Sequence, residues 1–372
     1  MKIPFLDLTA QYHSLRPEID NAVRRVMERG SFILGEEVAG FEQEFAAFCG
    51  AQQAVATASG TEALQLALLA CDVGVGDEVI TSAFTAVATI AAIEMTGARP
   101  ILVDIDPHRY TLSPACVQAA LSPRTRAMIP VHLFGCPADL SPLLDLACAH
   151  PIHLIEDCAQ AHGAAYLSKQ VGTWGELGAF SFYPSKNLGA YGDGGAILTN
   201  DNNLAEKLRK IRQFGWNPNR ISEEKGINSR LDEIQAAILR VKLPHLPAWN
   251  DRRRELARLY QSLLSDSGIP LPLFPADSEP VFHLYVIRHP RRDELLKFLA
   301  TREIQALVHY PVPIHLQPAY AKFGYQMGSL PETELASSEV LSLPLFPEMK
   351  EDEVIQVCRA ILDFQAQNHK FI

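Results

Sequence analysis

The chain has 372 residues, 48% of them hydrophobic, and a formal net charge of −10. This length suits about two domains, and this hydrophobic share suits a globular protein with a large buried core. The negative charge argues against a protein that coats nucleic acid or an anionic membrane.

The cysteines and the N-terminal segment indicate a compartment. Seven cysteines are scattered without CxxC or Cys/His metal spacing, which favours reduced thiols and predicts no metal site. Met1 leads into KIPFLDLTAQ, which lacks the apolar region of a signal peptide, and no run of about 18 apolar residues occurs. We expect a cytoplasmic protein with neither a nucleic-acid nor a membrane partner.

The first half of the chain predicts a layered α/β fold. Apolar residues at helical spacing predict two packing helices within the first 50 residues, and Gly50 ends the second. Strands and helices then alternate, with strands expected at 54–59, 78–83, 99–106, 127–135, 152–157 and 179–183, and helices at 60–70, 85–97 and 137–150. Such alternation predicts a mainly parallel sheet covered by helices on both faces.

The pattern changes beyond Gly226. We expect helices at 231–241, 249–264, 293–304 and 352–364, and strands at 281–289 and 304–310. These elements predict a smaller α+β unit. We place the boundary near residue 245, giving a large domain at 1–245 and a small domain at 246–372.

Lys186 is the centre of the candidate site. It follows the β-prone run AFSFY, and the next residues, PSKNLG, are too rich in Pro, Asn and Gly to continue a strand. An amine held at a strand end can form a Schiff base with a carbonyl once burial lowers its pKa. Asp157 stands in a matching position, at the end of the apolar strand IHLIED.

A lysine paired with an aspartate in this setting favours pyridoxal phosphate. The cofactor needs an amine for its aldehyde and an anion for its pyridine nitrogen, and the protonated ring then acts as an electron sink. An ordinary Asp–Lys salt bridge between two strand ends is the alternative. Ligands of parallel sheets gather beyond the carboxyl ends of the strands, so Ser59, Phe84, Asp157 and Lys186 should share one edge.

Two groups are suited to a phosphate. In Ser59-Gly60-Thr61, a strand-to-helix turn, the glycine allows close approach and the helix start offers free N–H groups. Ordinary N-capping by Ser59 or Thr61 would have the same sequence. Ser181, on the strand face of Tyr183, offers a hydroxyl.

Three further residues are suited to a flat, polar ring. Phe84 follows the strand EVITSA and could stack on such a ring, although a lone phenylalanine is more often part of a core. Gln160 and His162 follow Asp157 and are suited to hydrogen-bond a ring hydroxyl or the aspartate itself. Polar caps within a loop would have the same pattern.

Four segments, in this order along the chain, resemble the DegT/DnrJ family of pyridoxal-phosphate sugar aminotransferases: ASGTEAL, DCAQAHG, FSFYPSKNLGAYGDGGA and GINSRLDEIQAAIL. The resemblance covers nearly the whole chain, from IPFLDL to the C-terminal helix. It implies the aspartate aminotransferase fold, fold type I: a large domain with a mainly parallel sheet between helices, and a smaller α+β domain.

The resemblance also implies site residues. Lys186 matches the Schiff-base lysine and general acid/base, Asp157 the partner of the ring nitrogen, and Gln160 the partner of the ring hydroxyl. Phe84 falls where the family stacks an aromatic residue on the ring. The phosphate cup corresponds to Gly60, Thr61 and Ser181, completed by Asn228 from a neighbouring subunit, which implies a homodimer.

The resemblance implies transamination of a nucleotide-linked keto sugar, with the pyridoxamine form of the cofactor appearing during turnover and L-glutamate as donor. The segment LVHYPVPIHLQPAY is similar to that of members acting on dTDP-3-keto-6-deoxyhexoses. His309, Tyr310 and His315 are candidate sugar contacts, and Arg230 a candidate contact for an anionic group. A 4-keto acceptor stays open, because one side chain can change which sugar carbon faces the cofactor.

Two functions of other classes are the alternatives. An NAD-dependent oxidoreductase would need G-x-G-x-x-G after the first strand, but GAYGDGG comes late and lacks that order. A non-catalytic pyridoxal-phosphate-binding regulator would keep the same pocket, yet no separate basic or helix-turn-helix module is visible.

Overall fold

The computed structural model describes residues 2–368. Its α-helices are α1 (Leu8–Ser14), α2 (Arg16–Arg29), α3 (Glu36–Cys49), α4 (Gly60–Ala70), α5 (Val87–Met95), α6 (Pro114–Ala120), α7 (Leu140–Ala149), α8 (Asn202–Ile211), α9 (Glu233–Lys242), α10 (Leu246–Leu264), α11 (Arg292–Thr301), α12 (Pro331–Glu339) and α13 (Glu351–Asn368). Its strands are β1 (Gln53–Thr57), β2 (Glu78–Ser82), β3 (Arg99–Val103), β4 (Thr125–Ile129), β5 (His153–Asp157), β6 (Ala165–Tyr166), β7 (Lys169–Gln170), β8 (Leu177–Ser181), β9 (Gly195–Thr199), β10 (Ser278–Glu279), β11 (Tyr285–Arg288) and β12 (Val340–Leu343). None of these described helices is long and apolar enough to cross a bilayer.

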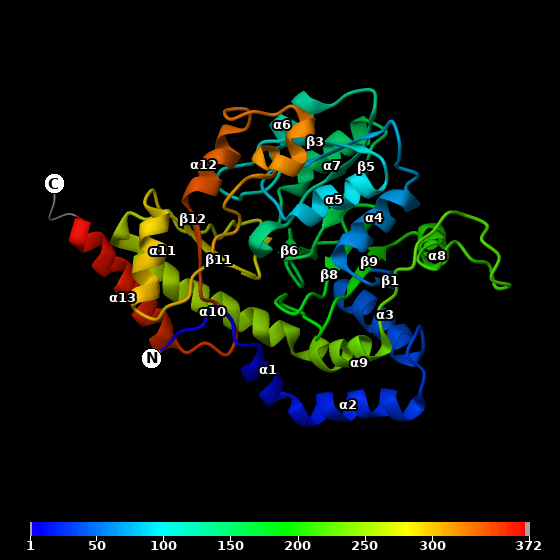
Figure 1. The fold of residues 1–372 in the computed structure, drawn as a ribbon, viewed down its shortest axis with the longest axis horizontal. Coiled ribbons are helices and arrows are strands. Elements are labelled where there is room, and N and C mark those ends of the chain that lie inside the picture. The colour runs from blue at the N-terminus through cyan, green and yellow to red at the C-terminus, as the bar shows by residue number, and fades with distance from the viewer. Residues whose placement is uncertain (1, 369–372) are drawn as a thin grey trace.

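A seven-stranded sheet forms the centre of the fold, in the order β1-β9-β8-β5-β4-β2-β3. Neighbours from β8 to β3 pair in parallel, and β9 pairs antiparallel with both β8 and β1. Only β9 therefore runs against the others. The predicted mainly parallel sheet between helices is confirmed, and Figure 1 shows helices around it.

Side chains that alternate along the strands build two separate cores, one on each face of the sheet. Val79 and Ile155 pack in a cluster with residues of α4, α5 and α8. Their neighbours Ile80 and Leu154 point the other way, into a cluster that includes α6 and α7. A further cluster joins that second face to α3 and α9. Both faces of the sheet are thus covered, as its apolar strands require.

The strand directions bring the candidate site to one edge. β1, β2, β5 and β8 all run the same way, so their carboxyl ends meet at a common edge of the sheet. Ser59, Phe84, Asp157 and Lys186 follow or end these strands. The prediction that they share one edge is confirmed.

The C-terminal elements have a core of their own. Residues of the second half of α10, of α11 and of α13 pack with β11 and β12, which pair antiparallel. Figure 1 shows α11 and α13 beside each other at the end of the molecule remote from α8. Ile3 belongs to this cluster and bridges to Ile304. The division into 1–245 and 246–372 stays a prediction, although Leu246 packs in the large core and Leu256 in the small one.

Two predicted strands differ from the structure, and proline accounts for the end of the first. The strand expected at 127–135 ends at Ile129, before Pro130, and residues Leu133–Gly135 form a 3₁₀ turn. The segment 304–310 makes isolated bridges only, at Ile304 and Leu307, and is followed by Pro311 and Pro313. Proline has no N–H to donate to a ladder. β12, which the sequence analysis did not predict, pairs with β11 instead.

Candidate active site

Lys186 lies in a tight loop immediately after β8. Its backbone N–H donates to the carbonyl of Tyr183 at 2.8 Å, which closes a turn around the lysine. At Gly189 the chain returns so closely that a Cβ would lie 2.3 Å from the carbonyl oxygen of Pro184. Glycine is required there, because any side chain would push the loop away from the lysine.

Buried side chains hold this loop on its far side. The amide of Asn187 donates to Asn250 Oδ1 at 2.9 Å and to the carbonyl of Val281 at 3.0 Å. Lys242, fully buried, donates to the carbonyl of Gly189 at 2.7 Å. Three elements distant in sequence therefore fix the backbone on which Lys186 stands.

The surroundings of Lys186 favour its neutral, nucleophilic form. Burial lowers the pKa of this half-buried amine to about 8, and the nearby charge of Asp157 opposes that shift. A lysine with an ordinary pKa of 10.5 would be almost entirely protonated at neutral pH. Lys186 is thus suited to attack a carbonyl and to move a proton.

Asp157 ends β5 with a side chain that is only 5% exposed. Burial raises the pKa of its carboxyl. Three contacts oppose that shift: the Ala159 N–H donates at 3.1 Å, the Thr89 hydroxyl donates at 2.9 Å, and Lys186 adds its charge. The carboxylate is thus held by two donors in a buried place, where a cation would be its natural partner.

The start of α4 and the end of β8 form a cradle suited to phosphate. Ser59 Oγ accepts the N–H of Glu62 at 3.2 Å and so caps the helix. This leaves the N–H groups of Gly60 and Thr61, which have no partner within a helix, for a ligand. A Cβ on Gly60 would lie 2.6 Å from Cβ of Ser181, so glycine permits the close approach of the two segments.

Aromatic rings surround Phe84. This side chain is 1% exposed, and its ring centroid lies 6.0 Å from those of Tyr110 and Phe134 and 6.4 Å from that of Tyr310. Gln160 connects this cluster to the loop after β5: its Oε1 accepts the Phe134 N–H at 2.7 Å and its Nε2 donates to the Tyr310 hydroxyl at 3.1 Å.

Lys186 opens into a cavity of about 430 Å³. Its lining combines polar and apolar residues from the N-terminal segment, the large sheet region and the C-terminal part: Phe5, Leu6, Gln160, Tyr183, Ser185, Lys186, Arg253, His283, Leu284, Leu307, His309, Tyr310 and Leu345. A concave, largely apolar site with a few convergent polar groups is typical of small-molecule binding.

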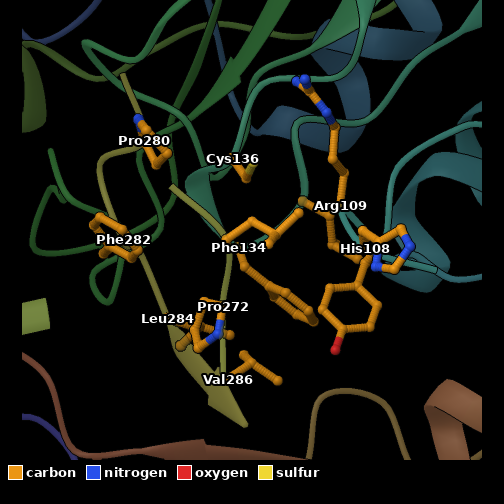
Figure 2. A pocket seen from close by; sticks show the side chains of 12 residues that line it. His108, Arg109, Phe134, Cys136, Pro272, Pro280, Phe282, Leu284 and Val286 are labelled. Carbon is orange, nitrogen blue, oxygen red and sulfur yellow. The ribbon is translucent and has the colours of Figure 1, made fainter. Parts of the chain in front are cut away.

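A second cavity lies beside the aromatic cluster, bordered by Phe134, Pro272, Leu284 and Val286 (Figure 2). It measures about 30 Å³, which is the share of one water molecule. A substrate does not fit there. The cavity at Lys186 is the candidate active site, because it contains the amine whose pKa is lowered by burial.

The comparisons with known proteins agree with this geometry. The DegT/DnrJ/EryC1/StrS aminotransferase family matches residues 13–362. The chain is 48% identical over 364 residues to dTDP-3-amino-3,4,6-trideoxy-alpha-D-glucose transaminase of Streptomyces venezuelae, covering 98% of this chain and 96% of that protein. The chain belongs to the DegT/DnrJ/EryC1/StrS aminotransferase family. It is an enzyme, as predicted.

Other relatives extend the comparison. The pleiotropic regulatory protein of Geobacillus stearothermophilus is 48% identical over 367 residues, covering 98% of this chain and 99% of that protein. The crystal structure of S. venezuelae DesV in complex with a ketimine intermediate has a TM-score of 0.96 at 48% identity and covers 98% of both chains. NtdA of Bacillus subtilis, solved with bound PMP, has a TM-score of 0.90 at 31% identity, covering 97% of this chain and 85% of that one. Fold type I is confirmed.

Of the residues predicted from the sequence, only Gln160, Lys186, His309 and Tyr310 line the cavity of this aminotransferase in the described chain. Gly60, Thr61, Phe84, Asp157 and Ser181 lie at the edge of the sheet instead, and four others have different surroundings. His315 is 1% exposed and its Nε2 lies 3.0 Å from Glu334 Oε1. His162 packs against Phe180 and Phe182, and burial lowers the pKa of its imidazole to about 3. Asn228 is exposed and Arg230 is half-buried, and neither lines the cavity of its own chain.

The structure adds site residues that the sequence analysis missed. Thr89 on α5 supports Asp157, and Arg253 on α10 lines the cavity while only 4% exposed. Arg253 donates to the carbonyls of Phe282 and Leu345 at 3.2 and 2.9 Å. A signal for Arg253 was present, because it falls at helical spacing among the apolar residues of α10, where a charge is unusual.

Proposed function

We propose that the protein transfers the amino group of L-glutamate to a dTDP-3-keto-6-deoxyhexose, with pyridoxal phosphate as cofactor. The observation that carries this proposal is the pair of Lys186 and Asp157 at one edge of the sheet. A half-buried amine with a pKa near 8 and a buried carboxylate held by two donors are what the cofactor's aldehyde and ring nitrogen need.

The residues present fit the cofactor. The N–H groups of Gly60 and Thr61 and the hydroxyl of Ser181 would hold its phosphate, Asp157 its ring nitrogen, Gln160 its ring hydroxyl and Phe84 its ring face. Bound there, the cofactor supplies an electron sink for the substrate carbon. Lys186 Nζ would hold its aldehyde in the resting enzyme and move the proton during turnover. The carboxylate of Asp157 would keep the ring nitrogen protonated.

The cavity supports a sugar nucleotide as acceptor. The relatives at 48% identity include a dTDP-sugar transaminase. His309 and Tyr310 line the cavity, and burial lowers the pKa of His309 to about 4, so its neutral ring can bond to sugar hydroxyls. A neighbouring hollow of about 580 Å³ shares Phe5 and Leu307 with the cavity and extends the room for a nucleotide. Arg253 and Arg230 are candidates for anionic groups.

Incubation of the purified enzyme with L-glutamate and dTDP-linked 3-keto or 4-keto deoxyhexoses tests the proposal. Mass spectrometry and NMR of the product should show an amine at C3. Amination of the 4-keto sugar alone would overturn the assigned position. Cofactor binding without turnover of either sugar would favour a non-catalytic pyridoxal-phosphate-binding regulator. The presence of both Lys186 and Asp157 argues against that function.

We also infer a cytoplasmic homodimer. All seven cysteines are free thiols, which supports a reducing compartment. The segment that carries Asn228 bridges to Gln213 and is flanked by exposed apolar side chains, among them Phe214 and Ile221 at 38% and 61% exposure. Asn228 is itself exposed. An exposed amide can reach a group on a second subunit, and exposed apolar side chains on the same segment suit a protein interface.

Mixing two inactive variants tests whether Asn228 acts across the dimer. Lys186→Ala and Asn228→Asp should each have little activity, the second because a carboxylate repels the cofactor phosphate. After subunit exchange, one pocket of a mixed dimer holds both defects and the other holds neither, so part of the activity should return. No recovery despite exchange proven by native mass spectrometry would show that Asn228 serves its own chain or no pocket.

Capture of pyridoxal phosphate by the cofactor-free enzyme should depend on pH through Lys186. Only the neutral amine attacks, so the rate constant should rise about tenfold per pH unit below pH 8 and level off above it. Stopped-flow absorbance measures this rate. A rate that still rises steeply at about pH 9.5 would show an amine of ordinary pKa. Lys186→Ala is the control, because it removes the amine that the capture requires and should abolish the pH-dependent phase.

A further inference from the structure

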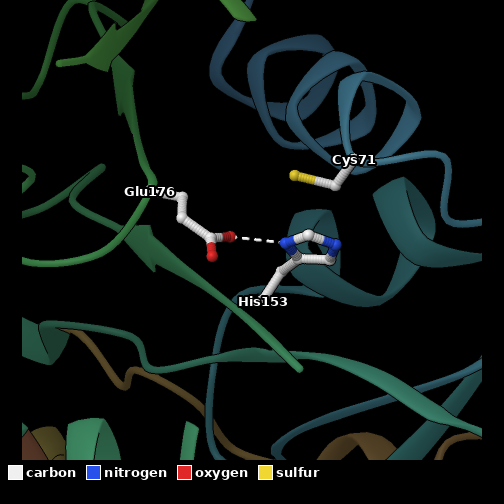
Figure 3. Close-up of side chains that lie close together, drawn as sticks. All are labelled: Cys71, His153 and Glu176. Atoms are coloured by element: carbon white, nitrogen blue, oxygen red, sulfur yellow. Dashed lines mark hydrogen bonds and ion pairs between the residues drawn. The ribbon is translucent and has the colours of Figure 1, made fainter. Parts of the chain in front are cut away.

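Cys71, His153 and Glu176 lie together at the edge of the sheet opposite the candidate active site. One donor atom from each lies within 4.8 Å of the other two. His153 Nδ1 is 2.5 Å from Glu176 Oε2. Figure 3 shows the thiol of Cys71 and the carboxylate of Glu176 turned toward the same side of the imidazole. The three ligands come from distant segments, so no short motif marks them.

This cluster is accessible from solvent. The side chains of His153 and Glu176 are 38% and 49% exposed, and Cys71 is half-buried. An ion can therefore enter without unfolding, and water can occupy a further coordination position. The ordinary alternative is an exposed histidine–carboxylate pair, which contributes at most about 1 kcal/mol to stability.

The other group of potential ligands in the described chain, His132, Glu156 and Cys158, is different in kind. It is fully buried, and its imidazole and carboxylate already have hydrogen-bond partners. Glu156 accepts the N–H groups of Gly172, Trp174 and Gly175 at 2.7 to 2.9 Å and faces His132 Nε2 at 3.1 Å. His132 Nδ1 accepts the Ala138 N–H. That group is a satisfied hydrogen-bond network with no position left for an ion.

Each ligand of the exposed cluster stands at the far end of an element that carries cofactor residues. Cys71 caps the C-terminus of α4, which begins at Gly60; His153 begins β5, which ends at Asp157; Glu176 precedes β8, which ends at Ser181. The lengths of these elements separate the cluster from the active site by roughly 13–17 Å. An ion there would join α4, β5 and β8 without touching the reacting groups.

We propose that Cys71, His153 and Glu176 bind one Zn²⁺ ion, with water completing a tetrahedron. Thiolate, imidazole and carboxylate are the three side-chain types that zinc takes, at about 2.0–2.3 Å. Bonds of that length at tetrahedral angles place ligand atoms roughly 3.3–3.8 Å apart. His153 Nδ1 and Glu176 Oε2, now 2.5 Å apart, must therefore separate, while the remaining donor atoms, within 4.8 Å, approach. Rotamer shifts of three accessible side chains achieve both. The thiolate and carboxylate neutralise the ion, and binding releases the protons of the thiol and of His153 Nδ1. The ion would join three elements beneath the cofactor site, away from the reacting groups.

Cobalt binding tests the site directly. The cofactor-loaded enzyme is freed of bound metal with a chelator and dialysed. It is then titrated with Co²⁺, a spectroscopic substitute for zinc. The zinc content of the protein is measured separately by elemental mass spectrometry. We expect one ion per chain, a thiolate-to-cobalt absorption band, and displacement of cobalt by zinc. Cys71→Ser should lose the band and the stoichiometric binding. Cys148→Ser, which removes an exposed thiol outside the cluster, should keep both.

Thermal unfolding gives a second readout. Zinc should raise the Tm of the wild-type enzyme, because a ligand that binds the folded state stabilises it. Glu176→Gln, an exposed substitution that leaves the fold intact, should remove most of this shift. An unchanged thiolate band in Cys71→Ser, equal losses in Cys148→Ser, or a wild-type enzyme that takes up no cobalt would each overturn the proposal.

Discussion

Replacement of Lys186 by alanine is expected to lower turnover by roughly 10³-fold or more, because one amine serves both as attachment point and as proton carrier. The loop that carries Lys186 is fixed by Asn187 and Lys242, not by the lysine side chain itself. Lys186→Ala should therefore fold normally and still bind the cofactor's phosphate. Transamination rates and the cofactor's absorption spectrum measure the two effects separately.

Borohydride reduction followed by peptide mapping makes this prediction specific. In the wild-type enzyme the cofactor should be found on Lys186. Lys242 is the strongest rival, since burial also lowers its pKa, yet it is fully buried and donates to the carbonyl of Gly189. A reducible bond at Lys242, or one that survives in Lys186→Ala, would contradict the assignment. Exogenous amines that restore part of the rate to Lys186→Ala would support it.

The positions of Lys186 and Asp157 could be predicted because sequence pattern fixes them. Both follow apolar strands, and the carboxyl ends of parallel strands meet at one edge of the sheet. Recognising the strands in the sequence was therefore enough to place the two side chains near each other. Gly60 and Ser181 follow by the same rule. Their close approach, which a Cβ on Gly60 would prevent, agrees with the glycine at the turn.

Residues whose position depends on packing between domains or distant segments could not be predicted in this way. His315 belongs to the same proline-rich segment as His309 and Tyr310, but it turns to Glu334 while the other two line the cavity. Nothing in local sequence distinguishes the three. Arg253 depends likewise on how α10 lies against the loop of Phe282, and Cys71 and His153 on how α4 covers β5.

Asp157→Asn is expected to lower turnover by roughly 10²–10³-fold while leaving the fold intact, because the amide keeps the shape of the carboxylate but loses its charge. The Ala159 N–H donates to Oδ1 and the Thr89 hydroxyl to Oδ2, so the amide oxygen can keep the first bond and the hydroxyl can rotate to accept from the new amide N–H. Burial raises the pKa of Asp157, which means that the charged carboxylate destabilises the folded protein when no cofactor is bound. Removing this charge should therefore not lower the Tm. The loss should appear in the rate of transamination, since the neutral amide cannot keep the pyridine nitrogen protonated.

The adjacent carboxylate is the matched control for that prediction. Glu156 is equally buried, but it points the other way and accepts three backbone N–H groups from the loop after β7. Glu156→Gln leaves at least one of these donors unpaired and should lower the free energy of unfolding by about 1–3 kcal/mol, with near-normal turnover by the molecules that stay folded. The two variants should therefore have opposite effects. Asp157→Asn should lower the transamination rate and leave the stability unchanged, while Glu156→Gln should lower the stability and leave the rate nearly unchanged. Near-normal turnover by folded, cofactor-loaded Asp157→Asn would refute the role of Asp157, because the lining of the cavity in the described chain contains no carboxylate that could replace it.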